Sequence, residues 1–95
     1  MYARVTSFKV DPARLDELPA KIKKMQPLAR ALPGIVDIYI AWRADGQGVV
    51  TAIYRTKAEA DAAVARLQVL WGTVADLFNV APRTDVYDTV EHFAG

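Results

Sequence analysis

The chain has 95 residues, 53% of them hydrophobic, with 12 Lys and Arg against 11 Asp and Glu. This length predicts one domain over residues 1–95, and a net charge of +1 argues against a nucleic-acid partner. There is no cysteine and the only histidine is His92. These counts exclude disulfides and thiolate chemistry and leave too few nitrogen ligands for a transition metal, so we expect no metal or other cofactor.

The N-terminal residues lack the apolar stretch of a signal peptide, because Arg4, Thr6, Ser7 and Lys9 interrupt it. No apolar run approaches the roughly 18 residues that a membrane-spanning helix needs. We therefore expect a cytoplasmic protein without a membrane partner.

The first third of the sequence predicts a strand followed by a helix. Residues 2–10 are rich in Val, Thr, Phe and Tyr, which favours a strand, and Asp11-Pro12 is a typical helix start. Pro19 and Pro27 are expected to kink or divide the helix, and Pro33-Gly34 to end it. Its apolar stripe has helical spacing and consists of Leu15, Leu18, Ile22, Met25, Ala29 and Leu32.

A hairpin is predicted next. Asp45-Gly46 is a hairpin turn signal between strands at residues 35–43 and 49–55. Strict alternation along the first of these strands would put Val36, Ile38, Ile40 and Trp42 on one face and Asp37, Tyr39 and Ala41 on the other.

The last third predicts a second helix and a fourth strand. Residues 56–59 (Thr-Lys-Ala-Glu) match a capping box. Gly72 is a weak point in the helix that follows, and residues 79–82 end it. The final strand is expected over residues 83–93. The helix has a long apolar face made of Ala60, Ala63, Val64, Leu67, Leu70, Trp71, Val74, Leu77 and Phe78.

This order predicts an α+β fold of the ferredoxin-like β-α-β-β-α-β kind, with a four-stranded antiparallel sheet. Right-handed crossovers would place both helices on one face of the sheet. The strands nevertheless carry large apolar residues in both alternation classes, for example Phe8 against Val5 and Ile38 against Tyr39. A monomer would expose one of these sets. We therefore predict that the chain pairs with itself, as a homodimer through the open face of the sheet.

Four stretches resemble the antibiotic-biosynthesis-monooxygenase-like domains of the dimeric α+β-barrel superfamily. They are Tyr2-Ala3-Arg4-Val5-Thr6, Leu32-Pro33-Gly34, Thr56-Lys57-Ala58-Glu59-Ala60 and Asp85-Val86-Tyr87-Asp88-Thr89-Val90. The resemblance implies a homodimer with a pocket between helices and sheet. It also implies a metal- and flavin-independent monooxygenase that acts on a small aromatic or quinol-like molecule.

The resemblance implies Trp71 and Arg83 as catalytic residues. The family's oxygenases place an Asn one helical turn before the Trp, where this chain has Leu67. Ser7, Tyr54 and Asn79 are therefore the candidates for substrate binding, with Thr51 a further polar residue. The family's haem-degrading branch needs a His on the second helix, and none occurs between Lys57 and Arg83.

Each candidate also has a purely structural interpretation. Trp71 lies in the apolar stripe of its helix and can be a core residue, while Arg83 and His92 can be exposed strand residues. Two other functions therefore stay open beside the oxygenase. One is a non-enzymatic protein that binds a small apolar or aromatic ligand, and the other is a structural homodimer.

Overall fold

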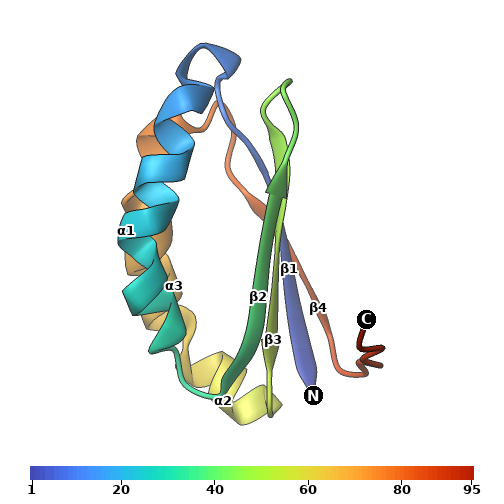
Figure 1. The fold of residues 1–95 in the computed structure, drawn as a ribbon. Helices are drawn as coiled ribbons and strands as arrows, with labels where there is room; N and C mark the ends of the chain where they lie inside the picture. Colours follow the sequence, from blue (N-terminus) through green and yellow to red (C-terminus); the bar gives the residue numbers. More distant parts are fainter.

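A computed structural model describes residues 1–95 as one four-stranded sheet with helices packed on it (Figure 1). No helix in it is long and apolar enough to span a membrane. In chain order the elements are β1 (Tyr2–Lys9), the 3-10 helix η1 (Pro12–Glu17), α1 (Leu18–Arg30), β2 (Ile35–Trp42), β3 (Gln47–Tyr54), α2 (Lys57–Ala62), α3 (Val64–Gly72), the 3-10 helix η2 (Ala75–Leu77) and β4 (Arg83–Tyr87).

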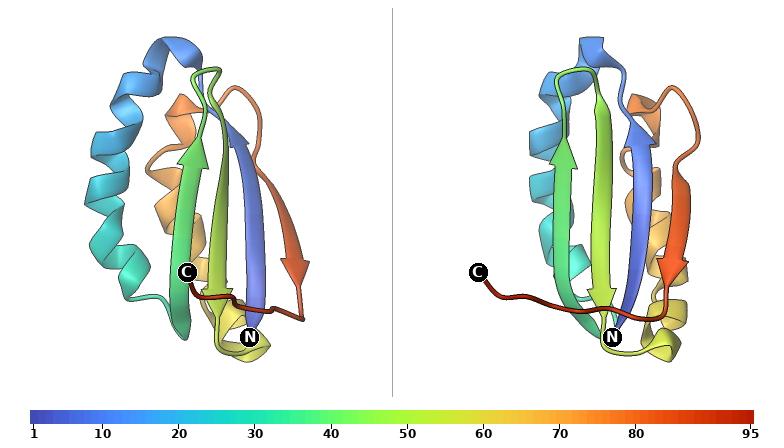
Figure 2. Two further views of the ribbon diagram at one scale, coloured as in Figure 1. Left: turned by 45° about the vertical axis from the view of Figure 1, so that its right-hand side comes forward. Right: turned by 90° about the vertical axis from the view of Figure 1, so that its right-hand side faces the viewer.

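The sheet has the strand order β2-β3-β1-β4, and every neighbouring pair is antiparallel. All helices lie on one face of the sheet, and the other face carries no helix (Figures 1 and 2). The predicted ferredoxin-like α+β fold is therefore confirmed. The edge strands are β2, beside α1, and β4.

The prolines of the first helical segment act differently. Asp11 caps the segment, its Oδ1 accepting a hydrogen bond from the Ala13 N–H at 3.0 Å. The chain then forms η1, and α1 begins at Leu18 with Pro19 in its first turn. Pro27 lies inside α1 without ending it. The segment thus changes from a 3-10 helix to an α-helix next to Pro19, where a proline at a helix start loses no hydrogen bond. Pro27 does not divide the helix.

Strand β2 departs from the alternation that the sequence predicts. Ile35 pairs with Tyr54 while Asp37 pairs with Ile53, so the register shifts at Val36. This bulge places Ile35, rather than Val36, on the same face as Ile38. Val36 still lines the same groove beside α1 as Ile38, Ile40 and Trp42, but it is 45% exposed and has no pairing partner on β3.

Glycines with positive φ close two turns, where a residue with a Cβ would be strained. Gly34 (φ 64°) links α1 to β2, and Gly46 (φ 89°) turns the β2–β3 hairpin. A Cβ on Gly46 would lie 2.0 Å from the Val10 carbonyl oxygen. Both turns were predicted from Pro33-Gly34 and Asp45-Gly46.

The second half follows the prediction at its start and departs from it at its end. Thr56 caps α2 by accepting a hydrogen bond from the Glu59 N–H at 3.2 Å, as the capping box predicts. The predicted long helix is divided into α2 and α3, and α3 ends at Gly72. The last strand ends at Tyr87 rather than at residue 93. Residues 88–95 form a tail that crosses in front of the open face (Figure 2), with Phe93 90% exposed.

The helices pack on the sheet through two apolar clusters. One surrounds Tyr54, and the other joins Phe8 and Val10 of the N-terminal segment to Leu18 and Leu77. Tyr2 and Phe8 face the helices. Ala3, Val5 and Ser7 therefore face the open side, because neighbouring side chains on a strand point to opposite faces.

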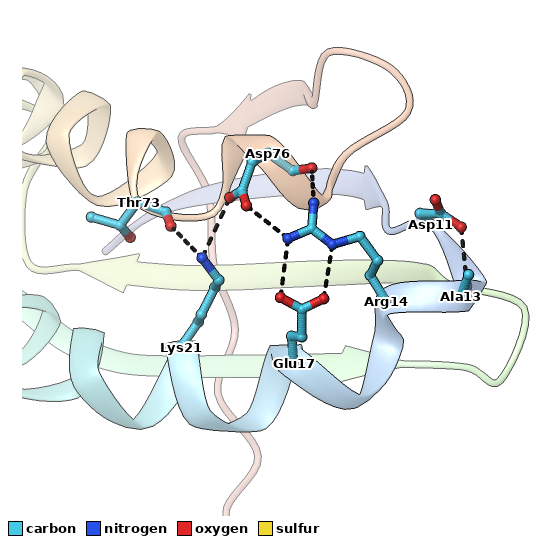
Figure 3. Close-up of polar contacts among 7 residues, drawn as sticks. All are labelled: Asp11, Ala13, Arg14, Glu17, Lys21, Thr73 and Asp76. Carbon is cyan, nitrogen blue, oxygen red and sulfur yellow. Dashed lines mark hydrogen bonds and ion pairs between the residues drawn. The ribbon is translucent and has the colours of Figure 1, made fainter.

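A polar network joins the start of the first helical segment to η2 (Figure 3). The Arg14 guanidinium donates to Glu17 at 2.8 and 3.0 Å and to the Asp76 carboxylate at 2.9 Å. Lys21 Nζ donates to the Thr73 carbonyl oxygen at 3.3 Å. Hydrogen bonds from Arg14 are the main reason that the pKa values of Glu17 and Asp76 lie below their usual range. The network joins the η1–α1 segment to the α3–η2 segment at this end of the sheet.

Candidate functional site

A partly open cavity of about 70 Å³ lies between the helices and the sheet. All 15 side chains that line it are hydrophobic. Its volume is roughly five times the minimum that holds one water molecule, and about half of the roughly 150 Å³ that accommodates benzene. An aromatic ligand therefore needs side chains of the wall to move apart. The lining residues come from α1 (Leu18, Ile22, Met25, Ala29), from the chain after it (Leu32), from the sheet (Phe8, Ile38, Ile40, Val50, Ala52) and from α3 and the chain beyond it (Leu67, Leu70, Trp71, Val74, Phe78).

Three aromatic rings from distant parts of the sequence form one wall of this cavity. The ring centroids of Phe8 and Trp71 are 6.1 Å apart, and those of Phe8 and Phe78 are 5.7 Å apart. Trp71 and Phe78 are also 5.7 Å apart, with their rings tilted by 51°. Tilted rings at these distances attract one another through their quadrupoles. The wall is therefore a preformed surface for another flat, apolar group.

Trp71 is the one predicted site residue that lines the cavity. Leu67, one helical turn before it, also lines the cavity and has no polar atom to offer there. The site can therefore exclude water and stack an aromatic ring, but its lining side chains cannot accept a proton.

Tyr54 lies next to the cavity without lining it. It is fully buried in the cluster that also contains Leu32, Ala52 and Leu70, three residues of the cavity wall. Its hydroxyl has no hydrogen-bond partner in the protein. Burial raises the pKa of the Tyr54 phenol, and the positive charge of Arg4 partly offsets this rise. Tyr54 is thus a buried polar group without a protein partner next to the wall of the cavity.

The other predicted site residues do not reach the cavity. Ser7 and Arg83 are register partners across β1 and β4, and both lie on the open face of the sheet. The Arg83 side chain is 82% exposed and lies 3.7 Å from Asp85. Asn79 is exposed in the loop after η2, where its N–H donates to the Lys9 carbonyl oxygen at 3.3 Å. The structure therefore does not bring Arg83 and Trp71 together.

Several cavity residues could not be recognised from sequence reasoning. Phe8 and Phe78 complete the aromatic wall, and Ile38 and Ile40 close the side formed by β2. In the sequence each of them is an apolar residue at a core position. Nothing there distinguishes a residue that lines a cavity from any other core residue. No group of three or more His, Asp or Glu side chains is arranged to hold a metal ion.

Comparison with known proteins places this arrangement in a familiar fold. No protein-family model matches the chain, and no curated protein matches it. Solved structures do match over nearly the whole chain. One is described as "Putative antibiotic biosynthesis monooxygenase from Nitrosomonas europaea", with a TM-score of 0.79 and 20% identity, covering 96% of this chain and 100% of that one.

Two further structures have the same fold. Rv0793 from Mycobacterium tuberculosis is 19% identical with a TM-score of 0.77, and 98% of each chain is covered. A conserved protein from Methanosarcina mazei Go1 is 10% identical with a TM-score of 0.79, covering 95% of this chain and 94% of that chain. The resemblance to monooxygenase-like domains is thus confirmed for the fold, and at these identities it is the fold that is shared.

The position of Tyr54 generates a prediction. Tyr54→Phe should leave the free energy of unfolding unchanged or raise it by about 1 kcal/mol, because it removes a buried hydroxyl that has no protein partner. Chemical denaturation measures this, with Tyr87→Phe, 52% exposed, as the control. A loss of more than about 1 kcal/mol in Tyr54→Phe alone would mean that the hydroxyl makes a stabilising hydrogen bond.

Proposed function

We propose that this protein is a monooxygenase-like domain that encloses a small aromatic or quinol-like molecule in its interior cavity. The observation that carries the proposal is the cavity itself, lined only by hydrophobic side chains and walled by Phe8, Trp71 and Phe78. A pocket of this kind favours a flat, apolar ligand through burial and ring stacking. The fold shared with structures described as putative antibiotic biosynthesis monooxygenases supports the monooxygenase-like part of the proposal.

In the enzymatic form of the proposal, the substrate reduces dioxygen without metal or flavin. A phenol and one dioxygen give a quinone and one water, so the substrate supplies every electron that dioxygen needs. The cavity would hold the ring against Trp71 and exclude bulk water. No lining side chain accepts a proton, so the phenol proton must leave through the opening of the cavity or before the substrate enters.

The second candidate function is binding without turnover, and one observation favours it. Leu67 lies one turn before Trp71 on the cavity wall, where the resemblance implies an Asn. Without that amide, the site lacks a hydrogen-bond donor for an anionic intermediate. A protein that carries or sequesters a small aromatic molecule needs only the apolar walls.

The proposal includes a homodimer, formed in the cytoplasm, in which two open sheet faces stack on each other. The open face carries Tyr39, 63% exposed, and Tyr87, 52% exposed, together with partly exposed Val5, Val49 and Ile53. The chain supplies no layer to cover this face beyond its C-terminal tail (Figure 2). Ser7 and Arg83 would then act at the dimer interface rather than at the cavity.

Oxygen uptake tests the enzymatic form. We expect the metal-stripped protein to consume dioxygen with some member of a hydroquinone and naphthol panel, above the autoxidation blank. Trp71→Phe should lower kcat/KM about tenfold, because an aromatic contact contributes about 0.5–1.5 kcal/mol. Arg83→Ala, changed on the opposite face, should match wild type. A ligand-dependent rise in melting temperature without oxygen uptake would favour the binding function. If neither oxygen uptake nor a rise in melting temperature is observed, a structural homodimer is favoured.

Sedimentation velocity tests the homodimer. The wild-type protein should sediment at twice the chain mass, and Tyr39→Glu should shift it toward the monomer, because it places a charge in the stacked faces. Val69→Glu is the matched control, since Val69 is 66% exposed on α3, away from the open face. A wild-type monomer at micromolar concentration, or equal dissociation in both variants, would contradict stacking through the open face.

A further inference from the structure

A surface groove lies between α1 and the edge strand β2, and it borders the cavity. Five side chains line both: Ile22, Met25 and Ala29 of α1, and Ile38 and Ile40 of β2. These residues are therefore a single layer of side chains with the cavity on one side and the groove on the other. No further strand covers β2 (Figure 2).

This layer is a partly exposed wall of the cavity, and the groove lies directly outside it. All five of its side chains are only partly buried, as are Leu67 and Trp71 of α3. The buried lining residues are Leu18, Leu32, Leu70 and Val74, and also Phe8 and Ala52 of the sheet. Met25 has a flexible side chain that adapts its shape at low cost. A short turn through Gly34 joins α1 to β2. An opening at this layer would need only these partly buried side chains to move.

The outer rim of the groove carries charge that the protein itself does not use. Lys23 and Arg30 project from α1 and Asp37 from β2, and none of the three makes an ion pair or a side-chain hydrogen bond in the structure. Two cations against one carboxylate give the rim a positive balance. Lys24, the neighbour of Lys23 in the sequence, lies outside the groove.

The hydrophobic lining of the cavity determines where the polar end of a ligand can bind. A polar group buried among the 15 hydrophobic side chains would lose its hydrogen bonds to water without replacement. The polar end of any ligand therefore stays at the opening, where water and the rim charges are within reach. Trp42, 39% exposed, also lines this groove, so the two tryptophans of the chain report separately on groove and cavity.

We propose that the groove between α1 and β2 is the entrance to the cavity and a binding site for the acidic end of its ligand. Lys23 and Arg30 hold a carboxylate or phenolate there, while the aromatic body of the ligand passes between Met25 and Ile38 into the cavity. This inference rests on the proposed function, and it narrows the ligand to small aromatic molecules with an anionic group.

Two probes of matched shape test the proposal: 2-naphthoate, which is anionic, and 2-naphthalenemethanol, which is neutral. Titrations followed by the indole N–H signals in ¹⁵N NMR, assigned with Trp42→Phe, should show both probes shifting Trp71. The wild-type protein should bind the naphthoate about fivefold more tightly than the alcohol, because exposed ion pairs contribute modestly. The preference should weaken as salt is raised.

Three variants with the same change of charge test which cation gives the preference for the naphthoate. Lys23→Glu and Arg30→Glu should abolish the preference for the naphthoate and leave the affinity for the alcohol within about twofold, since neither touches the cavity. Lys24→Glu should keep the preference. An equal loss in Lys24→Glu, or no preference in the wild type, would overturn the entrance site and leave cavity binding intact.

Two other outcomes are also decisive. If neither probe shifts Trp71, cavity binding fails, and the entrance site fails with it. The Trp42 indole signal can also shift with protein concentration in the absence of a probe and stay unchanged when either probe is added. In that case a second copy of the chain occupies the groove. That result would overturn the groove as a ligand entrance.

Discussion

The packing of Phe8 between the sheet and the helices is the contact on which the rest of the structure depends. Its ring lies over Gly48 so closely that a Cβ there would be 2.2 Å from it, and its other side meets Trp71 and Phe78. One strand residue therefore fixes the distance between the sheet and α3. Between Phe8 and α1 no aromatic ring fills the space between helix and sheet, and the cavity lies there.

Much of the fold was predictable because it depends on local signals. The Thr56–Glu59 capping box and the Gly46 turn each act over a few residues, and they set the order of the elements. The bulge at Val36 was not predictable, because it depends on how β2 pairs with β3. The last strand was predicted too long, since β1 begins at Tyr2 and offers residues 88–95 no partner beyond the Ala3–Tyr87 pair.

The candidate site was predictable only in part for a similar reason. Helical spacing placed Trp71 on the sheet-facing side of its helix, and the structure has it on the cavity wall. Alternation along β4 could not decide which face Arg83 takes. That choice comes from its register with Ser7 of β1, which puts both residues on the open face. The sheet thus separates the apolar cavity on one side from Ser7 and Arg83 on the other.

This separation favours ligand binding on the covered face of the sheet and self-association on the open face. The covered face provides an apolar, aromatic-walled space, with the charges of Lys23 and Arg30 at the groove beside β2. The open face provides exposed apolar residues, such as Tyr39, for a second copy of the chain. Ligand chemistry then depends on what the apolar walls exclude, and on the electrons of the ligand itself, more than on polar catalytic groups.

The most direct test of this account is the location of a bound aromatic ligand. Isotope-filtered NOE spectra of the ¹³C-labelled protein with unlabelled 2-naphthol would identify the contacting side chains. The account predicts NOEs to Trp71, Leu70 and the Ile38 methyl groups, all on the cavity wall. NOEs confined to Val5, Val49 and Tyr39 on the open face would contradict it.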